Sequence, residues 1–269
     1  PAHEIEAFRQ RLDAWARLAD EHLEMEVLRP LLEAPAIGPD PVQQQCSRQP
    51  VETPLSPLPV AVARDEAFHF RYPEMQDWLD ALAMPVIPWQ PLADEPLPDE
   101  ACGLILPGGF PELHAAELSQ CERSLSSLRD WFGQRPIYAE CGGMLLLGQS
   151  ITDGSGQSHA MAGVLPFHAT KGRLQVGYRR LEAEKDGLLL RRSETLTGHE
   201  FHRWELSAET PSADSVGKLR TLWQVEGWQV PRRREGWNHP SLHASWVHLH
   251  WGGCWTISCR WRAAVEAAT

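Results

Sequence analysis

Arg135-Pro-Ile-Tyr-Ala-Glu-Cys-Gly-Gly-Met-Leu-Leu-Leu-Gly148 predicts a strand, a sharp turn and a helix in immediate succession. Pro136 to Glu140 is typical of a short buried strand, Cys141 follows at once, and two glycines precede an apolar run that suits a helix. This order is that of a nucleophile elbow, in which the turn presents one reactive side chain. A helix N-terminus behind the thiol would favour the thiolate, which is the attacking species. The alternative is that Cys141 is only a small buried core residue.

Strand and helix patterns alternate around this segment. Helices are expected from Tyr72 to Leu82 and from Leu113 to Phe132, and strands at Val60–Ala63, Met84–Trp89 and Gly103–Leu106. The alternation predicts an α/β fold with a mostly parallel sheet flanked by helices. Prolines in residues 84–89 place that strand near an edge. Ligands of such folds bind beyond the carboxyl ends of the strands, where the Pro107-Gly-Gly109 turn and Cys141 are both expected.

The pattern is less regular after residue 160. Met161–Phe167, Arg173–Leu181, Thr197–His202 and Thr221–Val225 are expected to be strands, and Pro231–Glu235 a solvated basic turn. Leu242–Trp251 predicts a strand that carries His248 and His250 on one face, since alternate side chains of a strand share a face. A helix is expected within Gly252–Thr269.

The N-terminal region has a different composition. Residues 1–35 predict an amphipathic helical segment that Pro30 breaks or kinks. Residues 36–58 are rich in proline and predict a linker, which leaves residues 59–269 as the globular domain.

Composition excludes several classes of protein. The net charge is −11 with no long basic block, which argues against a nucleic-acid partner. No apolar run approaches the roughly 20 residues that cross a bilayer, so no membrane contact is expected. Six cysteines without a C-x-x-C pair favour reduced thiols and a cytoplasmic location, and no metal site is expected. The chain begins with Pro1, and we interpret it as a fragment or a processed piece.

A cysteine nucleophile needs a base and donors for an oxyanion. His248 and His250 are the candidate bases because they end an apolar strand late in the chain, although either can be structural among twelve histidines. Backbone N–H groups of Gly109 and Gly142 are placed to converge on Cys141. The order strand-Pro-Gly-Gly, strand-Cys-Gly-Gly, strand-His is more specific than any of these parts alone.

The motifs together resemble the class I glutamine amidotransferase domains, which have a flavodoxin-like fold, in the branch found in cobyrinic acid a,c-diamide synthases. The resemblance covers about residues 60 to 251, and its segments occur in the family's order: Val60–Phe68, Leu106-Pro-Gly-Gly-Phe-Pro-Glu-Leu113, Tyr138-Ala-Glu-Cys-Gly-Gly-Met144, Gly163-Val-Leu-Pro166, Gly177-Tyr-Arg179, Gly198-His-Glu-Phe-His202 and Ala244-Ser-Trp-Val-His-Leu-His250.

The resemblance implies glutamine hydrolysis. Cys141 would form a γ-glutamyl thioester, His248 would move the protons, and Gly108, Gly109 and Gly142 would bind substrate and oxyanion. His250 is the runner-up base, and it occupies the place where many class I relatives carry a glutamate that orients the histidine. The third member of a triad is therefore unassigned here. Glu200 and His202 either line the site or support the strand.

In the resembled family, ammonia passes to an N-terminal synthetase domain that uses ATP and Mg²⁺ to amidate a corrinoid. A phosphate loop of the form G-x-x-x-x-G-K-[ST] is not found in this sequence. We therefore expect no cofactor in this chain, and glutamine and the synthetase domain as its partners. Alternatives are the amidotransferase domain of a cobyric acid synthase or a nickel-tetrapyrrole diamide synthase, a binding module whose catalysis has lapsed, and another Cys-His hydrolase such as a peptidase.

Overall fold

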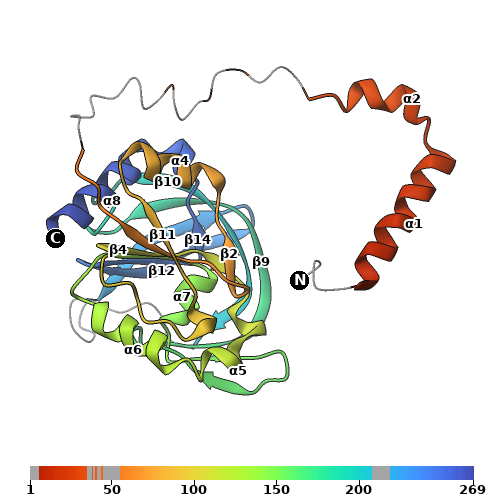
Figure 1. The fold of residues 1–269 in the computed structure, drawn as a ribbon. Helices are drawn as coiled ribbons and strands as arrows, with labels where there is room; N and C mark the ends of the chain where they lie inside the picture. The colour runs from red at the N-terminus through yellow and green to blue at the C-terminus, as the bar shows by residue number, and fades with distance from the viewer. Residues whose placement is uncertain (1–5, 35–37, 39, 41–43, 45–54, 208–218) are drawn as a thin grey trace. The chain divides into compact units, whose positions relative to one another are not determined.

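The chain divides into two compact units, residues 1–44 and 45–269, and the computed structural model describes residues 6–34, 38, 40, 44, 55–207 and 219–269 (Figure 1). The predicted linker at residues 36–58 falls largely outside this description. The first unit contains helices α1 (Glu6–His22) and α2 (Met25–Leu28) and the 3₁₀ helix η2 (Arg29–Leu31). The α-helix ends at Leu28, before Pro30, which lies inside η2, and an additional interruption occurs at Glu24, whose ψ of 77° is not helical.

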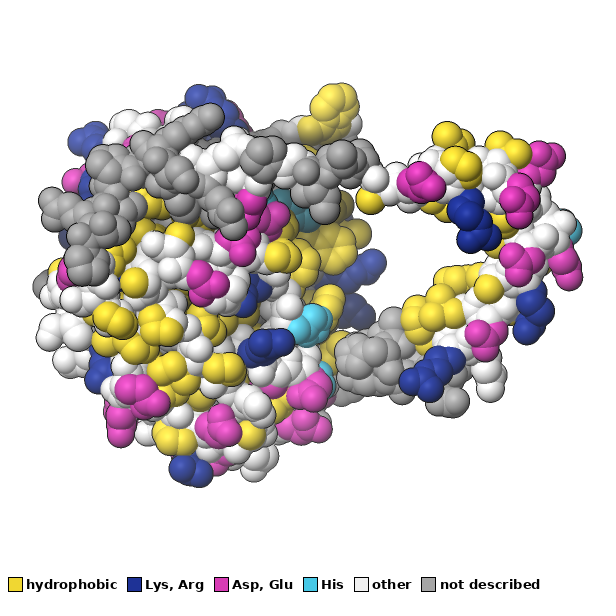
Figure 2. Space-filling model, turned by 45° about the horizontal axis from the view of Figure 1, so that its top comes forward, with side chains coloured by type: hydrophobic (Ala, Val, Ile, Leu, Met, Phe, Trp, Pro, Cys, Tyr) yellow, Lys and Arg dark blue, Asp and Glu magenta, His cyan; other side chains and the backbone are white. Residues whose placement is uncertain are grey.

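Large apolar side chains of the first unit face solvent rather than one another. Leu12, Trp15 and Leu18 on α1 are exposed, as are Leu31 and Leu32 further on. Yellow side chains are visible along this unit in Figure 2. An amphipathic helix normally buries its apolar face, and the unit itself does not provide a cover for this one.

A mixed sheet of 12 strands organises the described part of the second unit. Its parallel half has the order β3-β1-β4-β6-β13, formed by Val86–Trp89, Val60–Ala63, Gly103–Leu106, Ile137–Glu140 and Leu242–Ser245. All four pairings are parallel. The expected α/β fold is confirmed, and β3 lies at the edge that its proline predicts.

The sheet continues beyond β13 through antiparallel strands, in the order β12-β11-β9-β10-β14. These strands are Val230–His239, Arg220–Gly227, His168–Ala183, Thr195–Leu206 and Val247–His248. The short strands β7 (Ser150–Thr152) and β8 (Ser158–Ala160) attach beside β9. Only Trp246 separates β13 from β14 in sequence, yet β14 pairs with β10. The antiparallel part therefore curls back towards the end of the parallel strands.

Two predictions for this region are wrong. Residues 161–167 form no strand, and β9 begins only at His168. The predicted basic turn at 231–235 is part of strand β12. Arg232 and Arg234 point to one face of that strand and pair with Glu182 and Glu184, at the end of β9, two strands away in the sheet. Carboxylates across the sheet thus make the basic run compatible with a strand.

Helices cover both faces of the sheet (Figure 1). Helices α4 (Pro73–Ala81) and α8 (Trp255–Ala267) share one face and meet through Trp78 and Trp255, whose ring centroids are 4.6 Å apart. Helices α5 (Ala115–Leu118), α6 (Glu122–Trp131) and α7 (Gly142–Leu146) lie on the other face. The single helix predicted over 113–132 is divided because the Asp94 carboxylate accepts hydrogen bonds from the first free N–H groups of α6.

The carboxyl ends of β4, β6 and β13 meet at one edge of the sheet, as expected. There β4 leads into β5 (Gly108–Gly109), which pairs with β2 (Phe68–Phe70), and β6 leads directly into Cys141. Short 3₁₀ helices follow several strands: η3 (Pro91–Ala93), η4 (Pro111–Leu113) and η5 (Trp251–Gly253). None of the helices in the described ranges is both long and apolar enough to span a bilayer.

Candidate active site

Cys141 stands at a strained turn between β6 and α7. Its φ of 46° and ψ of −110° are unusual for a residue with a side chain, and such conformations cost about 1–3 kcal/mol. The surrounding backbone leaves no room to relax, because a Cβ at Gly143 would lie 2.2 Å from the Leu106 carbonyl oxygen. The predicted elbow is therefore present. Helix α7 has only five residues, which is shorter than expected, so its dipole adds little.

His248 is the histidine that faces this cysteine. It follows β13 by three residues, is buried, and interacts with the Cys141 thiol, which is one of the groups that raise the pKa of the imidazole. Its Nδ1 lies 3.1 Å from Oε2 of Glu140, which leaves Nε2 for the sulfur. The thiol also lies 3.6 Å from the carbonyl oxygen of Phe201. Cysteine, histidine and carboxylate thus form one continuous chain of contacts.

Glu140 is the site residue that sequence reasoning missed. Its carboxylate is buried and accepts hydrogen bonds from the Leu249 N–H, at 2.9 Å, and from the Tyr138 hydroxyl. Burial and the Glu140 charge raise the pKa of Tyr138 well above its usual value, so the hydroxyl remains a donor. A signal was present in the sequence: a glutamate ended an otherwise apolar strand, and charged side chains are rarely buried unless they are paired.

Opposing effects act on the protonation of His248. Burial lowers its pKa, but hydrogen bonds to Cys141 and Glu140 and the charges of both partners outweigh burial and raise the pKa to about 10. His199 lies opposite His248 across β10 and β14, and burial together with the His248 charge lowers the pKa of His199. The arrangement therefore favours the imidazolium form of His248.

The three glycines predicted at the site have different roles. Gly109 and Gly142 approach each other closely, since a Cβ on Gly142 would lie 2.9 Å from the Gly109 nitrogen. Gly142 begins α7, so its N–H has no acceptor within the helix. Both residues line the pocket beside Cys141 and fit the expected oxyanion donors. Gly108 instead makes room for the base, because a Cβ there would lie 2.5 Å from Cε1 of His248.

We expect Gly108→Ala to lower the rate of any reaction that uses His248 as a base by about 100-fold, because a methyl group at this distance must displace the ring. Steady-state kinetics will measure the loss. Gly154→Ala is the matched control, since a Cβ at Gly154 meets no atom within 4 Å. A Gly108→Ala enzyme with the activity of the control would show that the ring position does not matter.

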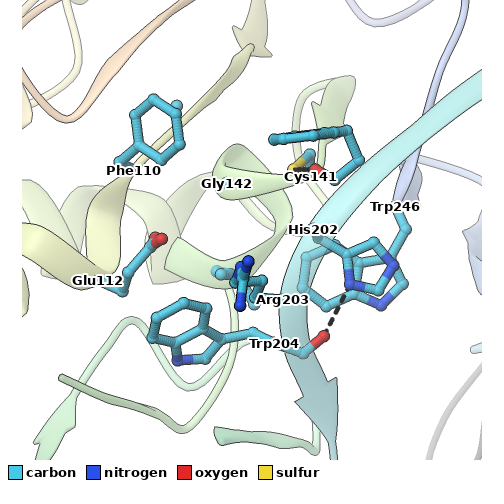
Figure 3. A pocket seen from close by; sticks show the side chains of 11 residues that line it. Phe110, Glu112, Cys141, Gly142, His202, Arg203, Trp204 and Trp246 are labelled. Atoms are coloured by element: carbon cyan, nitrogen blue, oxygen red, sulfur yellow. Dashed lines mark hydrogen bonds between the residues drawn. The ribbon is translucent and has the colours of Figure 1, made fainter. Parts of the chain in front are cut away.

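A pocket of about 130 Å³ opens at Cys141 (Figure 3). Aromatic side chains form much of its wall, and the charged side chains of Glu112 and Arg203 also line it. The volume is below the roughly 300–1,000 Å³ of sites for drug-sized ligands, so the pocket suits a small molecule such as an amino acid. Its full lining is Gly109, Phe110, Glu112, Cys141, Gly142, Leu145, Phe201, His202, Arg203, Trp204 and Trp246.

Glu200 and His202 serve different purposes. His202 lines the pocket, with its ring stacked on Trp246 at a centroid distance of 3.8 Å. Glu200 is fully buried behind it and binds His202 Nε2 at 2.9 Å, Arg179 Nε at 2.6 Å and the Arg233 guanidinium. Burial raises the pKa of Glu200, but the His202 hydrogen bond and the arginines outweigh burial and lower it to about 2. Glu200 therefore supports the pocket wall through a salt-bridged cluster.

His250 lies outside this constellation. It does not share a strand face with His248, because β14 ends at His248 and His250 precedes η5. Its Nε2 lies 3.5 Å from Glu74 Oε2, and its ring contacts Tyr72. The half-exposed side chain does not line the pocket. The geometry thus selects His248 over His250 as the residue that faces the thiol.

Comparison with known families agrees with this geometry. Residues 59–254 match the CobB/CobQ-like glutamine amidotransferase domain. The chain belongs to this family. The match spans β1, the elbow at Cys141 and the histidine strand β14, so the whole constellation falls inside the family domain.

Similar curated proteins are named cobyrinate or hydrogenobyrinate a,c-diamide synthase. The chain is 35% identical to the cobyrinate a,c-diamide synthase of Synechocystis sp. over 99% of its own length and 54% of that protein. It is 37% identical to the Gloeobacter violaceus protein of the same name, over 94% of the chain and 52% of the relative. A hydrogenobyrinate a,c-diamide synthase of Mesorhizobium japonicum is 34% identical, over 81% of this chain and 49% of the relative. The chain thus spans about half the length of these relatives.

Solved structures agree on the fold. A chain of PurLQS from Thermotoga maritima has a TM-score of 0.55 and 12% identity, covering 80% of this chain and 100% of that one. A glutamine amidotransferase from Thermotoga maritima has a TM-score of 0.50 and 14% identity, and the match covers 78% of this chain and 90% of that one.

Proposed function

We propose that this chain hydrolyses glutamine to glutamate and ammonia, with Cys141 as the nucleophile and His248 as the base. The observation that carries the proposal is the buried contact chain from Cys141 through His248 to Glu140, at the end of a pocket of amino-acid size. Intact contacts of this kind favour an active glutaminase over a module whose catalysis has lapsed.

The reaction begins with attack of the Cys141 sulfur on the side-chain carboxamide carbon of glutamine. A carbon–sulfur bond forms, and the carbonyl oxygen becomes an oxyanion that accepts hydrogen bonds from the N–H groups of Gly109 and Gly142. Imidazolium His248 then gives its proton to the leaving nitrogen, the carbon–nitrogen bond breaks, and ammonia departs. A γ-glutamyl thioester remains on Cys141.

Water completes the cycle. The water oxygen attacks the thioester carbon while neutral His248 takes a proton from the water. The carbon–sulfur bond then breaks and releases glutamate and the Cys141 thiolate. In both halves Glu140 holds the imidazole through Nδ1, so that Nε2 faces the reacting atoms, and it stabilises the imidazolium. Glu140 thus takes the part of the glutamate that many class I relatives carry two residues after the histidine, where this chain has His250.

The acceptor of the ammonia is proposed from the relatives. We place the chain as the glutamine-hydrolysing part of a cobyrinate or hydrogenobyrinate a,c-diamide synthase, in which a synthetase domain uses ATP and Mg²⁺ to activate corrinoid carboxylates. The alignment with the Synechocystis protein includes the first unit, which we assign to the synthetase side. Three partly exposed phenylalanines near Cys141 and His248, Phe70, Phe110 and Phe201, support a protein cover over the site.

A cytoplasmic location is part of the same proposal. Cys102, Cys121, Cys141 and Cys254 are free thiols. Free thiols are the normal state in a reducing compartment, and the proposed thiolate nucleophile requires one.

Glutamate release from glutamine tests the proposal, followed by an assay of amide formation on cobyrinate with ATP and the synthetase part present. We expect hydrolysis that rises when ATP and the acceptor are added, and amide nitrogen that derives from ¹⁵N-labelled glutamine. Hydrolysis with label transfer only to the acceptor that already carries the a and c amides, with cobyric acid as the product, would instead indicate a cobyric acid synthase. Peptide cleavage without glutamine turnover would contradict the proposal.

A further inference from the structure

Two charged side chains of the pocket have no part in the mechanism above. Glu112, in η4, and Arg203, on β10, both line the cavity that contains Cys141. Neither forms a salt bridge with any residue in the described ranges. Most other arginines of the antiparallel region pair with carboxylates, among them Arg179, Arg232 and Arg234. A carboxyl group and a guanidinium group without salt-bridge partners in the described ranges, both lining one small cavity, therefore need an explanation.

The pairing of β10 with β9 is irregular beside Arg203. Phe201, His202, Arg203 and Trp204 all line the pocket, although successive side chains of a regular strand point to opposite faces. One residue separates His202 from Trp204 on β10, whereas three residues separate their partners Gln175 and Lys171, so the extra residues of this bulge lie on β9. Bulges are common beside active sites. This one lies opposite Arg203, which lines the pocket together with its neighbours on β10.

Glu112 is held where water solvates it poorly. Its side chain is partly buried next to aromatic residues, and burial raises the pKa of its carboxyl group. Its own backbone N–H and His114 lower that pKa by a smaller amount. A partly desolvated carboxylate without a cationic partner is costly until a cation binds. In Figure 3, Glu112 lies across the pocket from Cys141, and Arg203 lies between Glu112 and His202.

We propose that Glu112 binds the α-ammonium group of glutamine and Arg203 its α-carboxylate, while the carboxamide reaches Cys141. This inference rests on the proposed function and adds the residues that make the site specific for an α-amino acid. The two charges complement the zwitterion at one end of the substrate. Three methylene and methine carbons connect that end to the reacting amide, and Phe110, Leu145 and Trp204 provide apolar walls for them.

Two truncated substrates separate the two contacts. Glutaramate lacks only the α-ammonium group of glutamine, and 4-aminobutanamide lacks only the α-carboxylate. Removing one charge-assisted hydrogen bond should lower kcat/KM by about 10- to 100-fold, mainly through KM. We expect Glu112→Gln to lose this factor on glutamine and 4-aminobutanamide but not on glutaramate. Arg203→Met should lose it on glutamine and glutaramate but not on 4-aminobutanamide.

Glu122→Gln and Arg123→Met are the matched controls, because they make the same changes on the exposed surface of α6 away from the pocket. They should match the wild type on all three substrates. If a pocket variant loses the same factor on all three substrates, or loses nothing on any of them, the inference is overturned. The proposed function still stands in that case, provided that the wild type hydrolyses glutamine. Absence of hydrolysis in the wild type, with every accessory component supplied, would overturn both.

Discussion

Cys141→Ala is expected to abolish glutamine hydrolysis, with kcat lower by about 1,000-fold or more. The sulfur forms the bond to the substrate, and no other group in the pocket can replace it, so removal of a covalent nucleophile costs nearly all of the chemical acceleration. The measurement is glutamate release, with thermal unfolding as a check that the variant is folded. The fold should tolerate the change, because alanine also fits the small buried site and the strained turn is retained.

Cys102→Ala is the control for loss of a thiol. Cys102 precedes β4 at the opposite end of the strand from the site, and its thiol lies 3.8 Å from the Glu100 carbonyl oxygen. This variant should keep full activity. A Cys141→Ala enzyme as active as Cys102→Ala would remove Cys141 from the mechanism.

Glu140→Gln should have the second largest effect, lowering kcat by about 100- to 10,000-fold. A glutamine side chain can still accept from Leu249 and Tyr138 through its oxygen, but it then turns an NH₂ group towards Nδ1 of His248. That group forces the imidazole into the tautomer with its proton on Nε2, which cannot accept the thiol proton. The variant is nearly isosteric, so the loss reports on charge and hydrogen bonding rather than on packing.

The pH profile distinguishes this cause from simple loss of structure. Glu140 is one of the partners that raise the pKa of His248 to about 10. The imidazolium form is the one needed beside the thiolate, so wild-type activity should fall only as pH rises through that value. Without the carboxylate the pKa of His248 is lower, and the alkaline limb of the profile should move to lower pH. An unchanged limb, or full activity, would contradict the role given to Glu140. Glu122→Gln, an exposed carboxylate on α6, should leave both rate and profile unchanged.

The parallel half of the fold was predictable because its signals are local. Each of β1, β4 and β6 is a short apolar run next to glycine or proline, and the two glycines after Cys141 permit the tight turn. The antiparallel half was harder, because long-range pairing determines it. Arg232 and Arg234 look like a solvated turn until Glu182 and Glu184 are placed beside them.

The site was predictable where a residue acts through its own chemistry and less so where it acts through a neighbour. Cys141 and His248 follow from nucleophile and base logic combined with strand order. Glu140 acts only through His248, which is 108 positions away in the sequence, so its role needed the contact itself. Gly108 was expected at the site as a binding residue. Position 108 requires glycine because the His248 ring lies beside it, and the sequence does not reveal this contact.

The most direct test of the central claim is covalent labelling with 6-diazo-5-oxo-L-norleucine, a diazo-ketone analogue of glutamine, followed by peptide mass spectrometry. We expect one adduct, on the peptide that contains Cys141, formed more slowly in Glu140→Gln and His248→Ala and blocked by excess glutamine. Glutamine turnover by an enzyme whose Cys141 remains unlabelled, or whose label lies on another cysteine, would contradict the account.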